Sequence, residues 1–170
     1  MAILLAVLVA VLIGADQLVK YWAVQELKPV GTKDFIHFGD FKILDLTYLE
    51  NDGAIFGSMS GQRWFLIGFT SLVVIAGIVF LFKVYRRSKF LDIALAMFIA
   101  GGIGNMIDRF RLDYVVDFFS FVLIHFPVFN VADIYIVVAT VLLAVLILFA
   151  YGEEDFQFLP FGRKKTGEKQ

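Results

Sequence analysis

The run WFLIGFTSLVVIAGIVFLF, residues 64–82, contains nineteen residues and no charged side chain. As a helix rising about 1.5 Å per residue it would extend roughly 29 Å, close to the thickness of a bilayer core. The composition agrees, because 60% of the 170 residues are hydrophobic, only 18% are charged, and the mean hydropathy is +0.83. A soluble domain would be about 45–50% apolar. The sequence therefore predicts an integral membrane protein with one domain.

Three further apolar runs accompany this one. Residues 2–15 are uncharged and end at Asp16. They lack the basic leader and small-residue cleavage site of a signal peptide, so we expect a retained helix that continues to about Trp22. Residues 93–107 form a short, glycine-rich run that needs its flanks to complete a crossing, and residues 134–151 form the last run. We therefore predict an all-α membrane protein with four transmembrane helices.

The segment between the first two spans is too polar to cross a bilayer. Gly39-Asp40 separates two β-rich runs, residues 35–38 and 41–49, which is typical of a hairpin. Phe38 and Phe41 would suit a small sheet at the lipid interface. We expect a small extracytoplasmic β-sheet at about residues 28–50.

Basic residues set the expected orientation. Lys83 to Lys89 contains four basic residues in seven positions, and further lysines and arginines lie near the C-terminus. Basic groups on the other face are spread more thinly, so the positive-inside rule places both termini in the cytoplasm. Residues 1–152 are then the membrane domain and residues 153–170 a polar cytoplasmic tail. This orientation gathers six polar residues near the outer face: Asp16, Asn51, Asp108, Asp117, Asn130 and Asp133.

Several classes of function are disfavoured by composition. The chain has no cysteine, which excludes disulfides, thiolate nucleophiles and cysteine-based metal sites. Its two histidines, His37 and His125, are too far apart to form a His-x-x-x-His zinc motif. We predict no metal and no cofactor. The net charge of −1 gives no reason to expect a nucleic-acid partner.

Asp117 and Asp133 are the first candidates for chemistry. Both lie next to aromatic or aliphatic runs. A carboxylate in such surroundings is costly unless it is paired, solvated or used.

Four motifs in a fixed order connect this chain with a known family. They are Asp16-Gln17-Leu18-Val19-Lys20, Asn51-Asp52-Gly53-Ala54-Ile55-Phe56-Gly57, Gly104-Asn105-Met106-Ile107-Asp108-Arg109 with Val115-Val116-Asp117-Phe118, and Phe129-Asn130-Val131-Ala132-Asp133. Up to about Tyr151 the chain closely resembles the bacterial lipoprotein signal peptidases, or signal peptidases II.

The resemblance implies an intramembrane aspartic endopeptidase of the bacterial inner membrane. It also implies an interfacial β-cradle, which agrees with the sheet expected at about residues 28–50. Such an enzyme removes the signal peptide from prolipoproteins, cutting before a cysteine that carries a diacylglyceryl group. Its partners would be this lipid-modified prolipoprotein and membrane lipid, its active site would lie at the extracytoplasmic face, and a monomer is expected. By resemblance Asp117 and Asp133 are the catalytic aspartates. The supporting positions would be Asn51, Gly53, Asn105, Asp108, Arg109, Asn130, Asp16 and Lys20.

Paired aspartates can hydrolyse a peptide bond without a metal. Two carboxylates about 4 Å apart repel by roughly 4 kcal/mol at an effective dielectric constant of 20, which is about three pK units. They therefore share one proton near neutral pH. The ionised member activates water, and the protonated member donates to the developing oxyanion or the leaving amine.

Structural alternatives exist for several of these residues. Asp133 or Asn130 could serve only as the N-cap of the fourth helix. Asp108 and Arg109 are expected to form an ion pair that fixes the end of the third span. Asn105 would suit a hydrogen bond between helices.

Two other functions compete with the peptidase. A small four-span transporter could use the aspartates to carry protons or cations, although transporters usually place such groups near the bilayer midplane. A non-catalytic lipoprotein-assembly partner is the second rival. A serine protease based on Ser58 or Ser60 is disfavoured, because no histidine or lysine occupies a matching motif.

Overall fold

The computed structural model describes residues 2–54 and 58–150. The predicted tail at 153–170, the end of the last apolar run at Tyr151 and part of the expected loop at 51–57 lie outside these residues. Within the described residues, four helices are long and apolar enough to cross a membrane. They are α1 (Ala2–Glu26), α2 (Arg63–Val84), α3 (Lys89–Leu112) and α4 (Val131–Val145), which continues as the short π-helix η2 (Leu146–Ala150). The prediction of four spans is confirmed, and flanking residues extend the short third run to 24 residues.

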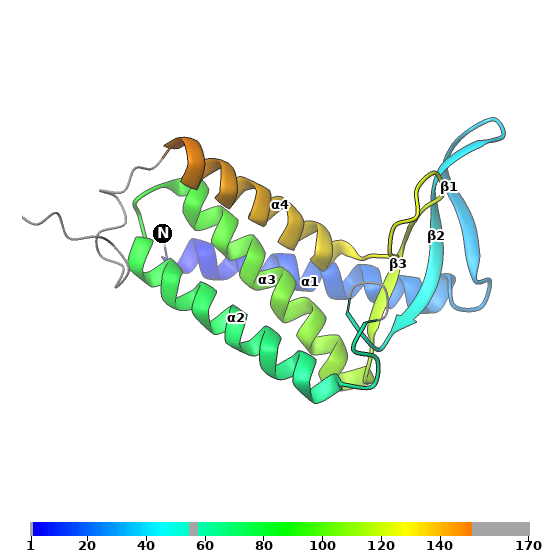
Figure 1. The fold of residues 1–170 in the computed structure, drawn as a ribbon, viewed down its shortest axis with the longest axis horizontal. Helices are drawn as coiled ribbons and strands as arrows, with labels where there is room; N and C mark the ends of the chain where they lie inside the picture. Colours follow the sequence, from blue (N-terminus) through cyan, green and yellow to red (C-terminus); the bar gives the residue numbers. More distant parts are fainter. Residues whose placement is uncertain (1, 55–57, 151–170) are drawn as a thin grey trace, which may run out of the picture.

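Helix α3 is the centre of the bundle. It packs against each of the other three helices (Figure 1). In the most apolar 18-residue stretch of α3, 61% of the residues are buried inside the protein, whereas 6–17% are buried in the corresponding stretches of the other three helices. Glycines make this packing possible. A Cβ atom at Gly101 would lie 2.5 Å from the carbonyl oxygen of Ala132, and one at Gly102 would lie 2.6 Å from the Val74 side chain. These two glycines therefore allow α3 to approach α4 and α2 closely.

A three-stranded antiparallel sheet covers one end of the bundle (Figure 1). Strands β1 (Thr32–Phe38) and β2 (Phe41–Asn51) form the predicted hairpin, with Phe38 paired to Phe41 and Gly39 at a positive φ of 60°. The sequence did not predict β3 (Val115–Phe121), which follows α3 and pairs with β2. The cradle therefore extends beyond the expected residues 28–50, because its third strand comes from between the last two helices.

The C-terminal end of α1 anchors this sheet. Ala23 of α1 and Leu27, just after the helix, pack with Leu46 of β2 and with Val116 and Phe118 of β3 in a buried apolar cluster. This burial removes apolar surface from water and is expected to fix β3 over the helices.

The segment before α4 is tied to the same strand. Phe119 and Phe129 exchange backbone hydrogen bonds in an isolated bridge, and their ring centroids lie 5.5 Å apart. The start of α4 is thereby held beside β3, which brings Asn130 close to Asp117.

The bundle has two chemically different ends. The start of α1, the turn between α2 and α3 and the end of α4 lie at one end, and the sheet lies at the other (Figure 1). The basic segment Lys83 to Lys89 therefore lies opposite the sheet.

Candidate active site

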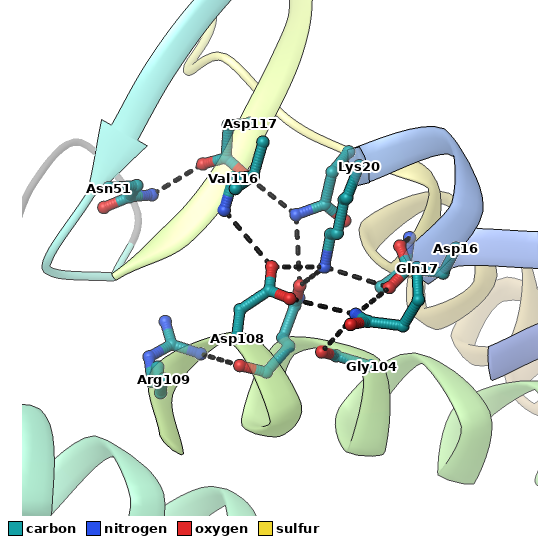
Figure 2. Close-up of polar contacts among 12 residues, drawn as sticks. Asp16, Gln17, Lys20, Asn51, Gly104, Asp108, Arg109, Val116 and Asp117 are labelled. Carbon is teal, nitrogen blue, oxygen red and sulfur yellow. Dashed lines mark hydrogen bonds and ion pairs between the residues drawn. The ribbon is translucent and has the colours of Figure 1, made fainter. Parts of the chain in front are cut away.

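A continuous hydrogen-bonded network forms beside the sheet. The network includes all ten residues that the sequence predicted for the site. They come from α1, from α3, from the end of β2 and the loop after it, from β3, and from the start of α4. Figure 2 shows much of this network. The ten residues are Asp16, Lys20, Asn51, Gly53, Asn105, Asp108, Arg109, Asp117, Asn130 and Asp133.

Asp117 lies in the middle of β3 and is 2% exposed. Its Oδ2 accepts a hydrogen bond from Asn51 Nδ2 at 2.8 Å, and its Oδ1 accepts one from Asn130 Nδ2 at 2.6 Å. Burial, followed by the negative charge of Asp133, raises the pKa of Asp117 to about 7. Its carboxyl group can therefore hold or release a proton near neutral pH.

Asp133 is the third residue of α4 and is half-buried. Its Oδ1 accepts from Asn105 Nδ2 at 2.8 Å, and its Oδ2 accepts from the backbone N–H of Asn130 at 3.0 Å. The Asn130 side chain accepts from the backbone N–H of Asp133 at 3.0 Å, which completes a capping box. Asn130 is therefore the N-cap of α4, and the Asp133 side chain completes the cap by accepting a hydrogen bond from its backbone N–H. Asp133 also lines the cavity described below.

Two asparagines connect the aspartates. Asn130 Nδ2 donates to Asp117 and also to Asn105 Oδ1, the latter at 3.0 Å, while Asn105 Nδ2 donates to Asp133. Asn105 lies on α3, so it also makes the hydrogen bond between helices that the sequence suggested. Both carboxylates are thus oriented by neutral amide groups.

The aspartates line a common cavity of about 610 Å³. Asn51, Asn105 and Arg109 lie on its wall with them. Most of the remaining wall is aromatic or aliphatic. It comes from the end of β3, the segment before α4 and α4 itself: Phe121, Phe126, Pro127, Val128, Phe129, Ile134, Ile136, Val137 and Val138. Such a cavity can receive a molecule that is polar at one point and apolar elsewhere.

The expected ion pair between Asp108 and Arg109 is wrong. Asp108 Oδ2 lies 2.9 Å from Lys20 Nζ, whereas Arg109 donates to the carbonyl oxygen of Gly53 at 2.9 Å and to that of Asn105 at 3.4 Å. Consecutive residues on an α-helix point about 100° apart. Asp108 therefore faces α1, while Arg109 faces the loop after β2.

A buried charge cluster lies behind the aspartates. Lys20 Nζ lies 3.0 Å from Asp16 Oδ2 and 2.9 Å from Asp108 Oδ2 (Figure 2). It also donates to Asn105 Oδ1 at 2.8 Å. Asp16, Lys20 and Asp108 are at most 3% exposed. Gln17 was not among the predicted site residues, although its side-chain amide donates hydrogen bonds to the carboxylates of Asp16 and Asp108. Its spacing of three residues from Lys20, which places both on one helix face, could have indicated this.

Four membrane-spanning helices, with two carboxylates on the wall of one largely apolar cavity, are the arrangement of an integral membrane peptidase of the aspartic type. The family described as Signal peptidase (SPase) II matches residues 8–149. The chain belongs to this family.

Individual relatives agree with this assignment. The chain is 41% identical over 142 residues to the lipoprotein signal peptidase of Lactococcus lactis subsp. lactis (strain IL1403), covering 84% of this chain and 91% of the relative. It is 41% identical over 150 residues to that of Clostridium acetobutylicum, covering 86% and 95%. The protein is therefore a membrane protease that processes prolipoproteins, and the transporter and assembly-partner alternatives are set aside.

Solved structures show the same fold. One bacterial membrane enzyme has a TM-score of 0.75 at 27% identity, with coverage of 95% of this chain and 94% of that chain. A second has a TM-score of 0.74 at 28% identity, with coverage of 86% and 94%.

Proposed function

We propose that Asp117 and Asp133 are the catalytic pair that hydrolyses the signal-peptide bond. The observation that carries this proposal is their common cavity, where Asn130 and Asn105 orient both carboxylates. Asp117 approaches from a strand and Asp133 from a helix, so the two groups belong to separate, well-supported elements.

The two carboxyl groups divide the acid and base roles between them. The ionised member takes a proton from water as the water oxygen bonds to the scissile carbonyl carbon. The protonated member gives its proton to the leaving nitrogen as the carbon–nitrogen bond breaks. A pKa of about 7 for Asp117 suits this division, because the pair keeps one proton near neutral pH.

The apolar wall of the cavity is the place for the lipid part of the substrate. Val137 and Val138 line the cavity and are 59% and 46% exposed on α4, so this wall continues onto the outer surface of the bundle. Burying acyl chains contributes about 0.8 kcal/mol per CH₂ group. The diacylglyceryl group on the substrate cysteine would supply much of the binding energy, and the substrate would reach the site by moving within the bilayer.

The proposed orientation places the sheet and the site on the extracytoplasmic side. The basic segment Lys83 to Lys89 lies at the opposite end, as the positive-inside rule requires of a cytoplasmic turn. The cysteine-free chain allows a direct test with single cysteines. A membrane-impermeant thiol reagent added to intact cells should label His37→Cys and spare Lys89→Cys; the reverse pattern would invert the orientation.

Replacement of each aspartate tests the catalytic assignment. Asp117→Asn and Asp133→Asn should remain folded and inserted but fail to cleave a diacylglyceryl-modified precursor peptide. Asp34→Asn is the matched control, because it makes the same chemical change in the exposed hairpin, where Asp34 pairs with Lys42. The unlipidated peptide should be cleaved poorly by the unaltered enzyme. Full cleavage by both single variants would show that this pair does not perform the reaction.

A further inference from the structure

The residue that precedes each proposed catalytic aspartate is held in the same way. The backbone N–H of Ala132, just before Asp133, donates to Asp16 Oδ1 at 2.9 Å. The backbone N–H of Val116, just before Asp117, donates to Asp108 Oδ2 at 3.2 Å. A buried carboxylate therefore holds the main chain of α4, and another holds that of β3.

These two carboxylates are themselves bridged twice. Lys20 Nζ lies 3.0 Å from Asp16 and 2.9 Å from Asp108. Gln17 Nε2 donates to Asp108 Oδ1 at 2.9 Å and to Asp16 Oδ2 at 3.2 Å (Figure 2). Gln17 and Lys20 come from the same helix, so α1 connects the two attachment points.

We propose that Asp16, Gln17, Lys20 and Asp108 act as positioning residues that set the separation of the Asp117 and Asp133 carboxylates. We call these four residues the carboxylate bracket. The proposal rests on the catalytic assignment of Asp117 and Asp133 and adds a role for Gln17.

Stability alone is a weak explanation of the bracket. Two acids and one lysine give this cluster a formal charge of −1 beside two further carboxylates, and buried ion pairs often stabilise a protein no more than apolar residues of similar size. The neighbouring backbone also makes room for it. A Cβ atom at position 104 would lie 2.6 Å from Asp16 Oδ2, so glycine at this position allows the carboxylate to stay where it is.

The distance between the carboxylates of Asp117 and Asp133, which we call the dyad, affects the reaction in two ways. A displacement of about 1 Å in a reacting group can lower the rate about 100-fold. The repulsion between two carboxylates also falls as their distance increases. This repulsion sets the interval between the first and second proton losses, and hence the width of the bell-shaped pH profile of kcat.

Other charged groups near the dyad must be kept constant in a test of spacing. Asp16 and Lys20 on α1, Asp108 and Arg109 on α3 and the two aspartates themselves make up the charges of the network. On β2, Glu50 is exposed and paired with Lys28 at 2.7 Å. In the loop after β2, Asp52 accepts a hydrogen bond from Ser60.

Two variants change the bracket without changing its charge. Gln17→Met removes one of the two bridges, and Asp108→Glu displaces the carboxylate that holds Val116. Both should lower kcat about 10- to 100-fold with little change in KM, because none of the four bracket residues is among those lining the cavity. The pH profile of kcat should narrow from both sides as the carboxylates move apart.

Controls separate positioning from stability and from charge. Val74→Ala weakens the contact of α2 with α3 at Gly102 and should lower the melting temperature while leaving the width of the profile unchanged. Asp16→Asn removes a negative charge, which should move both limbs of the profile toward lower pH in addition to any narrowing.

The outcomes distinguish the two proposals. If Asp117→Asn and Asp133→Asn are inactive while Gln17→Met and Asp108→Glu keep the original kcat and profile width, the bracket is refuted and the catalytic assignment remains. A lower melting temperature in Gln17→Met with an unchanged profile would also refute the bracket, because it would show a structural role only. Cleavage by both asparagine variants would overturn the catalytic assignment itself. Should Asp108→Glu fail to fold, Gln17→Met decides the question.

Discussion

The hydrogen bond from Asn51 to Asp117 offers a direct test of the acid–base assignment. Asn51 Nδ2 donates to Asp117 Oδ2 at 2.8 Å, and this bond favours the ionised carboxylate. Asn51→Ala removes the donor, so the pKa of Asp117 should rise above its value of about 7. The alkaline limb of the activity profile, where the pair loses its last proton, should move to higher pH.

The size of this shift follows from the strength of the lost bond. A hydrogen bond to a charged group contributes about 1.5–3 kcal/mol, and about 1.4 kcal/mol corresponds to one pK unit. The alkaline limb should therefore move upward by about one to two pH units. The assay measures kcat from pH 5 to pH 10 with a fluorogenic lipid-modified peptide.

A neighbouring variant controls for changes in the strand. Glu50→Gln alters the adjacent residue of β2, whose exposed side chain pairs with Lys28, and it should leave the alkaline limb in place. Asn51→Ala also loses a bond from the backbone N–H of Gly53, so its maximal rate should fall, and the position of the limb is the deciding observation. An alkaline limb that stays in place or moves to lower pH in Asn51→Ala would refute the reasoning.

Three further outcomes are expected. Gly104→Ala should destabilise the protein by about 1–3 kcal/mol through overpacking against Asp16, whereas Gly77→Ala, with its nearest contact at 3.5 Å, should not; thermal unfolding in detergent compares them. Phe126→Ser should raise KM for the lipid-modified peptide about 10-fold, since about 1–2 kcal/mol of apolar contact on the cavity wall is lost. An unchanged KM would show that the lipid part of the substrate does not bind to this wall. EDTA should leave turnover unchanged, because paired carboxylates need no metal, and inhibition reversed by added metal would contradict this.

The four helices were predictable because each is a nearly continuous apolar run. The hairpin was also predictable, since Gly39 and Asp40 separate two β-rich segments and the pairing is local. Strand β3 was not, because its partner β2 lies far away in the chain: Leu49 pairs with Asp117. The sequence around Asp117 indicated a carboxylate that is costly to place among aromatic residues. It did not indicate that this segment pairs with β2 or in which register.

The sequence predicted which residues form the candidate site better than it predicted which of them contact each other. The motifs and the family resemblance identified all ten residues of the network. They did not show which way adjacent side chains point, so the pairing of Asp108 with Lys20 in place of Arg109 was missed. The bond from Ala132 to Asp16 joins residues 116 positions apart, and no local pattern encodes such a contact.

The position of Lys20 four residues after Asp16 has a consequence for the order of assembly in the membrane. The two charges face each other along one helix, so they can neutralise each other as soon as α1 is synthesised. This lowers the cost of inserting α1 before any neighbour exists. Asp108 has its lysine on another helix, so α3 reaches its charge partner only when it docks against a first helix that is already in the bilayer.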